Sequence, residues 1–535
     1  MTQNDSCCRF LSRVIYSCHW EQSSDNNSKR ACCWFLFVAL VSLLSLCWMY
    51  IWYIASNDQD EVNWNAFTKL NLWVNWFVVV MIISALLTSY CVLLLLFALI
   101  QLALQEPLDL HWLHKILLFL DVLVIVSGVT VITKFGRKEW STVLLSMQAA
   151  GPFLQFGAVG ALTVLSPFVL RGFHMADKKW SKLLIAVVFL TVSAVIFLCP
   201  LYIQSPCLIE KHNLPEKPKL IGHRGAPMLA PENTMMSFNK SIACGVTAFE
   251  TDVQLSKDRI PFLMHDKNSG FLLRTTDVKE KFPNQNFNSS TSLTWDEYQT
   301  LNAGEWFLKA DPFRSVSKLS EEDVETARNQ TIPSLHQLLI LAKQHNISVL
   351  FDLYNPDEEN DTEDIVNTIL NSGINPRLVL WLPPKKREFV KKTVPGFIQV
   401  YSNSENLQEN KGNYLNAPYN LSMEKIRELR GMNVTVNLWV VNEPWLFSLL
   451  WCAGVSSVTT NSCHILKKMD KPHWVMALQT YNIAWISVNI VAIVLMTGLY
   501  MFHWKRHCFR HRTGIQNQRD NTSVLHDREQ VSLLL

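Results

Sequence analysis

Residues of reactive types follow or interrupt three short apolar runs in the stretch 219–266. His223 and Arg224 follow the run 219–222, Glu250 and Asp252 lie within the run 248–253, and His265 follows the run 260–264. Apolar runs of this length predict strands. Strand residues two apart point to the same face, so Glu250 and Asp252 converge without a turn. Carboxylate oxygens at this spacing suit a hard divalent cation, Ca²⁺ or Mg²⁺, better than zinc.

These residues stand in motifs that resemble the glycerophosphodiester phosphodiesterase family. The resemblance covers about residues 215–470 and implies a (β/α)₈ TIM barrel with its site at the C-terminal ends of the strands. It also implies a glycerophosphodiester substrate and one divalent cation. The matching motifs are His223-Arg224-Gly225, Pro231-Glu232-Asn233-Thr234, Glu250-Thr251-Asp252 and His265-Asp266.

The resemblance assigns chemical roles to the motif residues. Phosphodiester cleavage needs a base, an acid and neutralisation of the phosphoryl oxygens. His223 and His265 are the candidate catalytic residues, since imidazoles titrate near pH 6.5, and which of them is the base stays open. Arg224 is the candidate phosphate-binding residue. The family mechanism implies attack by the neighbouring glycerol hydroxyl, giving a cyclic intermediate that water opens.

A third metal ligand and several substrate contacts are expected outside the central motifs. Asp352 aligns with a family carboxylate and completes a metal set with Glu250 and Asp252, although a capping role would also explain it. Tyr354 replaces a basic residue of the family, and Asn461 replaces an aspartate and receives no catalytic role. The candidate site-ordering or substrate-contacting residues are Glu232, Asn233, Tyr354 and Trp439. Helix capping at Asn233 or Thr234 and barrel packing at Trp439 remain alternatives.

The elements that must position these residues belong to two kinds of sequence. Of the 535 residues, 49% are hydrophobic and only 17% are charged, a balance typical of a mixed membrane and soluble chain. Long apolar stretches, each sufficient to cross a bilayer, lie at about 32–55, 72–100, 113–133, 141–170, 183–203 and 474–502. The predicted domains are a cytosolic segment 1–31, five transmembrane helices in 32–203, a barrel in 206–472, a sixth helix at 474–502 and a cytosolic disordered tail at 503–535.

The barrel is expected to begin with the runs at 219, 248 and 260. Further strands are predicted at 348–353, 378–382, 397–400, 414–416, 434–440 and 455–459, with helices between them. The stretch 271–328 is rich in Asn, Ser and Thr and is expected to form an irregular insertion over the site.

Loop charges predict the orientation of the chain. The loop 57–69 is mainly acidic, whereas the loop 171–182 and the tail after 502 are basic, which places both termini in the cytosol and the barrel on the extracellular or lumenal side. The loop 134–139 breaks this pattern. Cys207, Cys244, Cys452 and Cys463 form an even set that could pair in an oxidising compartment. Candidate N-glycosylation sites on this side are Asn239, Asn288, Asn329, Asn346, Asn360, Asn420 and Asn433.

We therefore predict an integral membrane hydrolase of the plasma membrane or an endomembrane. Its expected reaction is hydrolysis of glycerophosphodiesters such as glycerophosphocholine or glycerophosphoinositol to an alcohol and a phosphomonoester. Two alternatives stay open: cleavage of glycosylphosphatidylinositol anchors, and a non-catalytic signalling protein that retains the barrel. The small net charge of +3 and the absence of basic patches interleaved with aromatic residues argue against a nucleic-acid partner.

Overall fold

The computed structural model describes residues 14–18, 28–70, 72–104, 108–135, 137–175, 178–265, 270–285, 287, 289, 292–353, 361–502 and 504–505. The chain divides into two compact units. One comprises Met1–Ser146 and Pro215–His473, and the other comprises Met147–Leu214 and Trp474–Leu535.

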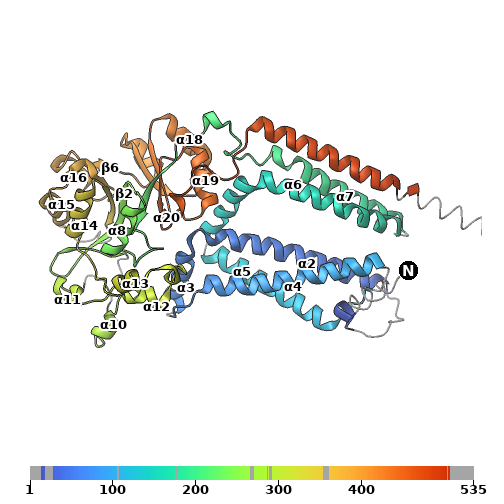
Figure 1. Ribbon diagram of the computed structural model, residues 1–535, viewed down its shortest axis with the longest axis horizontal. Helices are drawn as coiled ribbons and strands as arrows, with labels where there is room; N and C mark the ends of the chain where they lie inside the picture. Colours follow the sequence, from blue (N-terminus) through green and yellow to red (C-terminus); the bar gives the residue numbers. More distant parts are fainter. Residues whose placement is uncertain are drawn as a thin grey trace, which may run out of the picture. The chain divides into compact units, whose positions relative to one another are not determined.

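A closed barrel of eight parallel strands forms the larger part of the first unit (Figure 1). The strands follow one another around the sheet in the order β6-β5-β4-β2-β1-β9-β8-β7, and a bridge between Tyr401 and Leu415 joins β6 to β7. This is the (β/α)₈ TIM barrel that the family motifs imply. The strands are β1 (Lys219–His223), β2 (Ala248–Leu255), β4 (Ser348–Leu353), β5 (Val379–Trp381), β6 (Ile398–Gln399), β7 (Tyr414–Pro418), β8 (Thr435–Trp439) and β9 (Ser457–Thr460).

The run 260–264 is wrongly predicted as a barrel strand. It forms β3 (Pro261–Leu263), which pairs antiparallel with the end of β2, Val253 lying opposite Leu263. The chain reverses within residues 256–260, where the backbone N–H of Ile260 donates to Ser256 Oγ. A parallel neighbour would need a crossover of about a dozen residues or more, which this turn is too short to provide. The other predicted strands supply the barrel without it.

Helices follow the strands, and several of them begin after a hydroxyl-bearing residue that caps the first turn. Thr234 accepts a hydrogen bond from the backbone of Ser237, and Ser334 forms a reciprocal capping box with Gln337. The capping alternative for the motif at 231–234 is therefore correct for Thr234. The helices are α8 (Met235–Ala243), α14 (Leu335–His345), α15 (Asp361–Ser372), α16 (Arg387–Thr393), α17 (Ser404–Glu409), α18 (Met423–Gly431), α19 (Pro444–Ala453) and α20 (Cys463–Leu466).

The insertion after β3 is not irregular. It folds as short helices around a core of its own that includes Phe262, Phe271 and Tyr298. Asn, Ser and Thr are frequent here because they cap short helices and fill turns, as Thr294 does in a capping box with Glu297. The helices are α9 (Gly270–Thr275), α10 (Val278–Lys281), α11 (Trp295–Gln299), α12 (Glu305–Ala310) and α13 (Glu321–Arg328).

Long apolar helices make up the rest of the first unit: α2 (Ser28–Ile54), α4 (Trp76–Leu104), α5 (Trp112–Phe135) and the start of α6 (Arg137–Met175). Asp121 in α5 is buried between helices and accepts hydrogen bonds from Ser45 and Cys91. The predicted loop between the first two apolar spans is instead a short 3₁₀ turn, η1 (Ala55–Asp58), followed by the helix α3 (Gln59–Leu70).

The second unit consists of apolar helices, the end of α6, α7 (Lys179–Leu198) and the helix Leu478–Phe502. Tyr481 Oη donates to the carbonyl of Pro152 at 3.0 Å, and Trp485 Nε1 donates to the carbonyl of Phe197 at 2.9 Å. Six helices in the described part of the chain are long and apolar enough to cross a membrane, at the predicted positions.

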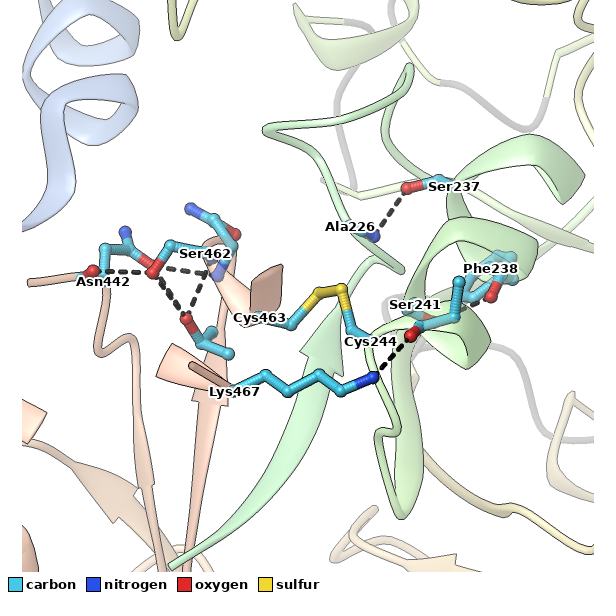
Figure 2. The surroundings of a disulfide bond; sticks show 12 residues. Ala226, Ser237, Phe238, Ser241, Cys244, Asn442, Ser462, Cys463 and Lys467 are labelled. Carbon is cyan, nitrogen blue, oxygen red and sulfur yellow. Dashed lines mark hydrogen bonds between the residues drawn. A yellow bond between two sulfur atoms is a disulfide. The ribbon is translucent and has the colours of Figure 1, made fainter. Parts of the chain in front are cut away.

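The predicted cysteine set is oxidised. A disulfide joins Cys244, which follows α8, to Cys463 at the start of α20 (Figure 2). Cys207 and Cys452 are also disulfide-bonded. The Cys244–Cys463 bridge connects the first and last βα units of the barrel, which are 219 residues apart in the sequence.

Candidate active site

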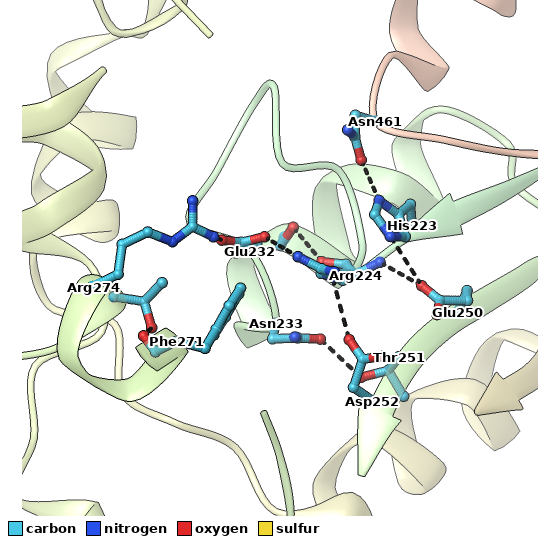
Figure 3. Close-up of polar contacts among 12 residues, drawn as sticks. His223, Arg224, Glu232, Asn233, Glu250, Thr251, Asp252, Phe271, Arg274 and Asn461 are labelled. Atoms are coloured by element: carbon cyan, nitrogen blue, oxygen red, sulfur yellow. Dashed lines mark hydrogen bonds and ion pairs between the residues drawn. The ribbon is translucent and has the colours of Figure 1, made fainter. Parts of the chain in front are cut away.

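The C-terminal ends of β1, β2 and β9 bring a histidine, an arginine and carboxylates together (Figure 3). His223 ends β1, and its Nδ1 lies 2.6 Å from Asn461 Oδ1, just after β9. An amide oxygen only accepts hydrogen bonds, so Nδ1 carries the proton and Nε2 keeps its lone pair. Nε2 lies 3.9 Å from Glu250 Oε2. Burial and the neighbouring Arg224 guanidinium hold the pKa of His223 well below its usual range, which keeps the imidazole neutral.

Arg224 lies at a sharp turn directly after β1. Its φ of 51° is followed by 89° at Gly225, where a Cβ would lie 2.5 Å from Ser237 Oγ. Only glycine fits there, as the motif predicts. The Arg224 Nη1 donates to Glu232 at 2.9 Å, and Nε lies 3.2 Å from Asp252 Oδ2. These carboxylates raise the pKa of Arg224. The guanidinium also lies over the ring of Phe271, at 5.1 Å from its centre.

Three carboxylates lie on two adjacent strands. Asp252 of β2 is in register with Asp352 of β4, two residues beyond Glu250. Burial and the nearby Asp252 charge raise the pKa of Glu250 well above its usual range and that of Asp352 to about 6. These shifts mean that the pocket does not supply enough positive charge for the carboxylates to ionise easily.

The charge of these side chains fits a divalent cation, although their positions do not form a complete coordination shell. Four carboxylates, on Glu232, Glu250, Asp252 and Asp352, face the guanidinium groups of Arg224 and Arg274, so full ionisation leaves an excess of two negative charges. One divalent cation would supply that charge, and oxygen donors are the ones it prefers. Within the described residues, no three His, Cys, Asp or Glu side chains are yet arranged around one centre.

Sequence reasoning missed Arg274, which lies in the insertion. Arg274 Nη2 pairs with one oxygen of Glu232, while Arg224 takes the other, so one buried carboxylate bridges two arginines. The Arg274 guanidinium packs over the rings of Phe271 at 4.7 Å and Trp306 at 5.1 Å. No motif or periodicity marks this residue. Asn461, which the sequence analysis noted without giving it a catalytic role, lies at the same edge and accepts the hydrogen bond of His223.

The structure describes three of the remaining residues singled out from the sequence: His265, Asn233 and Trp439. His265 follows β3 beside Phe271 and is close enough to act electrostatically on both His223 and Asp352. Asn233 is buried, and its Oδ1 accepts from Thr251, while its Nδ2 has no hydrogen-bond partner among the described residues. Trp439 ends β8, half-buried at the same edge of the barrel. Tyr354 and Asp266 lie outside the described residues.

The predicted glycosylation sites within the described residues are all exposed. Their asparagine side chains lie on helix surfaces, in turns or at helix ends, where a glycan would extend into solvent. They are Asn239, Asn329, Asn346, Asn420 and Asn433. Asn288 and Asn360 lie outside the described residues.

Comparison with known proteins places the chain in a family. A model of the glycerophosphoryl diester phosphodiesterase family matches residues 223–484. Human glycerophosphoinositol inositolphosphodiesterase GDPD2 is 40% identical over 528 residues, which cover 96% of this chain and 97% of that protein. Chicken glycerophosphodiester phosphodiesterase domain-containing protein 5 is 38% identical, covering 91% of this chain and 83% of that protein.

Among solved structures, a putative glycerophosphoryl diester phosphodiesterase from Silicibacter pomeroyi is 18% identical. It covers 49% of this chain and 97% of its own, with a TM-score of 0.41. The long match to the human and chicken proteins includes the apolar helices as well as the barrel. The chain therefore belongs to the glycerophosphoryl diester phosphodiesterase family and is a phosphodiesterase.

Proposed function

We propose that this protein hydrolyses glycerophosphodiesters to an alcohol and a phosphomonoester at a barrel held to a membrane by its apolar helices. The observation that carries the proposal is the neutral His223, whose Nδ1–H is fixed by Asn461 and whose Nε2 lies beside Arg224 and Glu250. The imidazole is buried, is held in one tautomer and lies next to the Arg224 guanidinium, which can bind a phosphate. This arrangement is suited to general-base catalysis on a phosphodiester.

The proton transfers follow from this geometry. His223 Nε2 removes the proton from the attacking oxygen, either water or the neighbouring glycerol hydroxyl, as that oxygen forms its bond to phosphorus. His265 donates a proton to the leaving oxygen as the P–O bond to the departing alcohol breaks. When the glycerol hydroxyl attacks, this step gives a cyclic phosphodiester, and water then attacks phosphorus. One histidine takes up the proton of that water and the other protonates the ring oxygen as its P–O bond breaks, which gives the phosphomonoester. The Arg224 guanidinium binds a phosphoryl oxygen, and the buried Asn233 Nδ2, which has no hydrogen-bond partner among the described residues, donates to the substrate.

Glu250, Asp252 and Asp352 are the residues that would hold a divalent cation, Ca²⁺ or Mg²⁺. The excess of negative charge in the pocket and the raised pKa of Asp352 support this assignment. When bound, the cation supplies Lewis-acid stabilisation of the phosphoryl oxygens. Glu232, which Arg274 also pairs, holds the Arg224 guanidinium at the site, where it acts on the substrate phosphate.

The proposal includes the membrane topology that the loop charges predict. Both termini lie in the cytosol, and the barrel of 206–472 lies on the extracellular or lumenal side. The disulfide-bonded cysteines and the exposed sequons support this side, because disulfides and N-glycans form outside the cytosol.

Glycerophosphoinositol is the substrate to test first, because the name of the human relative specifies it and that protein matches 96% of this chain. Purified full-length protein is incubated with glycerophosphoinositol, glycerophosphocholine and glycerophosphoethanolamine, and the products are identified by mass spectrometry. Release of an alcohol and a phosphomonoester from one of them supports the proposal, and the products name the bond. No hydrolysis of any diester, with release of an anchored protein from cells, would favour glycosylphosphatidylinositol anchors instead. Neither activity would leave a non-catalytic barrel.

A further inference from the structure

The segment 57–73, between the apolar helices α2 and α4, contacts the barrel next to the site at two places. Asn57 in η1 contacts the loop after β8, and Trp64 in α3 contacts the insertion. Figure 1 shows α3 beside the helices of the insertion. A separate contact joins α3 to the start of α4: Asn63 donates to Asn75 and accepts from the backbone of Phe77.

The first contact leads to His223 through buried amides. Asn57 is 1% exposed, donates from Nδ2 to the carbonyl of Val440 at 2.9 Å, and accepts from the backbone N–H of Asn442 at 3.0 Å. Asn442 Oδ1 accepts from the backbone N–H of Asn461 at 2.8 Å. Asn461 Oδ1 then accepts from His223 Nδ1. Three buried asparagines thus connect the membrane-proximal turn to the imidazole.

The second contact leads to Arg224. The Arg274 guanidinium packs over Trp64 at 4.5 Å and Trp73 at 5.5 Å, in addition to the rings that the insertion contributes. Aromatic faces stabilise a buried guanidinium and restrict its rotation. Arg274 in turn shares Glu232 with Arg224. The two tryptophans therefore limit where Glu232 can hold the phosphate-binding arginine.

We propose that Asn57, Trp64 and Trp73 are positioning residues of the active site, so that the catalytic unit comprises the barrel together with the segment between the first two apolar helices. This inference rests on the proposed function, since it assigns His223 and Arg224 to the reaction. It predicts that the membrane helices and the site are one cooperative structure on this side of the barrel, and that disturbing the segment impairs turnover before it impairs folding.

The test compares full-length variants in detergent micelles, with glycerophosphoinositol as the substrate. Asn57→Ala is expected to lower kcat at least tenfold with less than a threefold change in KM, because it displaces the general base and not a substrate-binding group. Trp64→Ala is expected to lower kcat at least tenfold and to raise KM as well, because it displaces the arginine that binds the phosphate. Trp64→Phe keeps an aromatic face and is expected to retain kcat within threefold. Asn63→Ala is the matched control: a buried asparagine of the same segment with its hydrogen bonds to the α4 side, expected to lower the thermal midpoint but to keep kcat within twofold.

A second measurement does not depend on turnover. Hydrogen exchange of the backbone amides of Asn442 and Asn461 is expected to accelerate at least tenfold in Asn57→Ala and to stay unchanged in Asn63→Ala. Equal losses of kcat in Asn57→Ala and Asn63→Ala, or unchanged exchange in Asn57→Ala, would overturn the inference. A wild-type protein that hydrolyses no diester would refute the proposed function alone, and the exchange experiment would still decide whether Asn57 orders Asn461.

Discussion

The hydrogen bond between Asn461 and His223 determines which imidazole nitrogen carries the proton. Leucine at position 461 has a similar size but no acceptor, so Nδ1–H would be buried without a partner. In the transition state His223 becomes positively charged, and its hydrogen bond to the amide oxygen, 2.6 Å long in the free protein, becomes charge-assisted. A hydrogen bond to a charged group contributes about 1.5–3 kcal/mol. The Asn461→Leu change should therefore lower kcat about 10- to 150-fold.

The aspartate variant tests the same hydrogen bond with the opposite expectation. Asn461→Asp keeps an acceptor for Nδ1–H and adds a negative charge that raises the pKa of His223 from its depressed position. We expect kcat at neutral pH to stay within about threefold of wild type, because the correct tautomer is retained. Initial rates with glycerophosphoinositol over a range of concentrations separate kcat from KM for both variants.

A buried asparagine elsewhere in the barrel provides the control. Asn437 is fully buried and bonds to Asn416, Thr459 and Ser457 away from His223. Asn437→Leu should lower the thermal midpoint without lowering kcat per folded molecule. Wild-type kcat in Asn461→Leu, or equal losses of kcat in Asn461→Leu and Asn461→Asp at unchanged thermal midpoints, would refute the role given to this hydrogen bond.

Three further outcomes follow from the same site and fold. Asp352→Asn should weaken Ca²⁺ or Mg²⁺ binding by at least about tenfold in titration calorimetry, since one anionic ligand is lost; unchanged affinity would remove Asp352 from the ligand set. Because the pKa of Asp352 is raised to about 6 and that of Glu250 well above its usual range, protons compete with the cation for both carboxylates, and the dissociation constant should rise at least tenfold per pH unit below pH 6; a dissociation constant independent of pH would contradict this ligand set. Replacing Cys244 and Cys463 together by serine should destabilise the barrel by about 2–5 kcal/mol, measured by urea unfolding, because the bridge closes a loop of 219 residues; unchanged stability would contradict this role.

Much of the barrel follows from local patterns. Strands buried on both faces read as short apolar runs, and polar residues where these runs end, such as His223 and Asp352, mark the C-terminal edge of a parallel sheet. Run length does not reveal strand direction, which is why β3 was wrongly expected in the barrel. Its antiparallel pairing with β2 follows from the short turn at 256–260. A connection between parallel strands needs about a dozen residues or more, so the length of this turn is the signal that indicates the strand direction.

The contacts around Arg274 could not be predicted from the sequence, for a different reason. Its partners Glu232, Trp64 and Trp306 come from three separate parts of the chain, and none of them follows a strand or helix period shared with it. The irregular appearance of the insertion concealed its short capped helices, which obtain most of their stability from a shared core and not from helix propensity. Long-range side-chain pairing of this kind is fixed by the tertiary fold.

Hydrolysis of glycerophosphoinositol by the purified full-length protein, with and without a chelator and beside His223→Ala and His265→Ala, tests the central claim most directly. The site described above predicts turnover by the wild type that the chelator abolishes and that Ca²⁺ or Mg²⁺ restores. It also predicts at least a hundredfold loss of kcat in each histidine variant at unchanged thermal midpoint, the usual size of an acid–base contribution. Turnover that survives the chelator would contradict the cation assigned to Glu250, Asp252 and Asp352, and undiminished turnover in His223→Ala would contradict the assignment of this imidazole as the base.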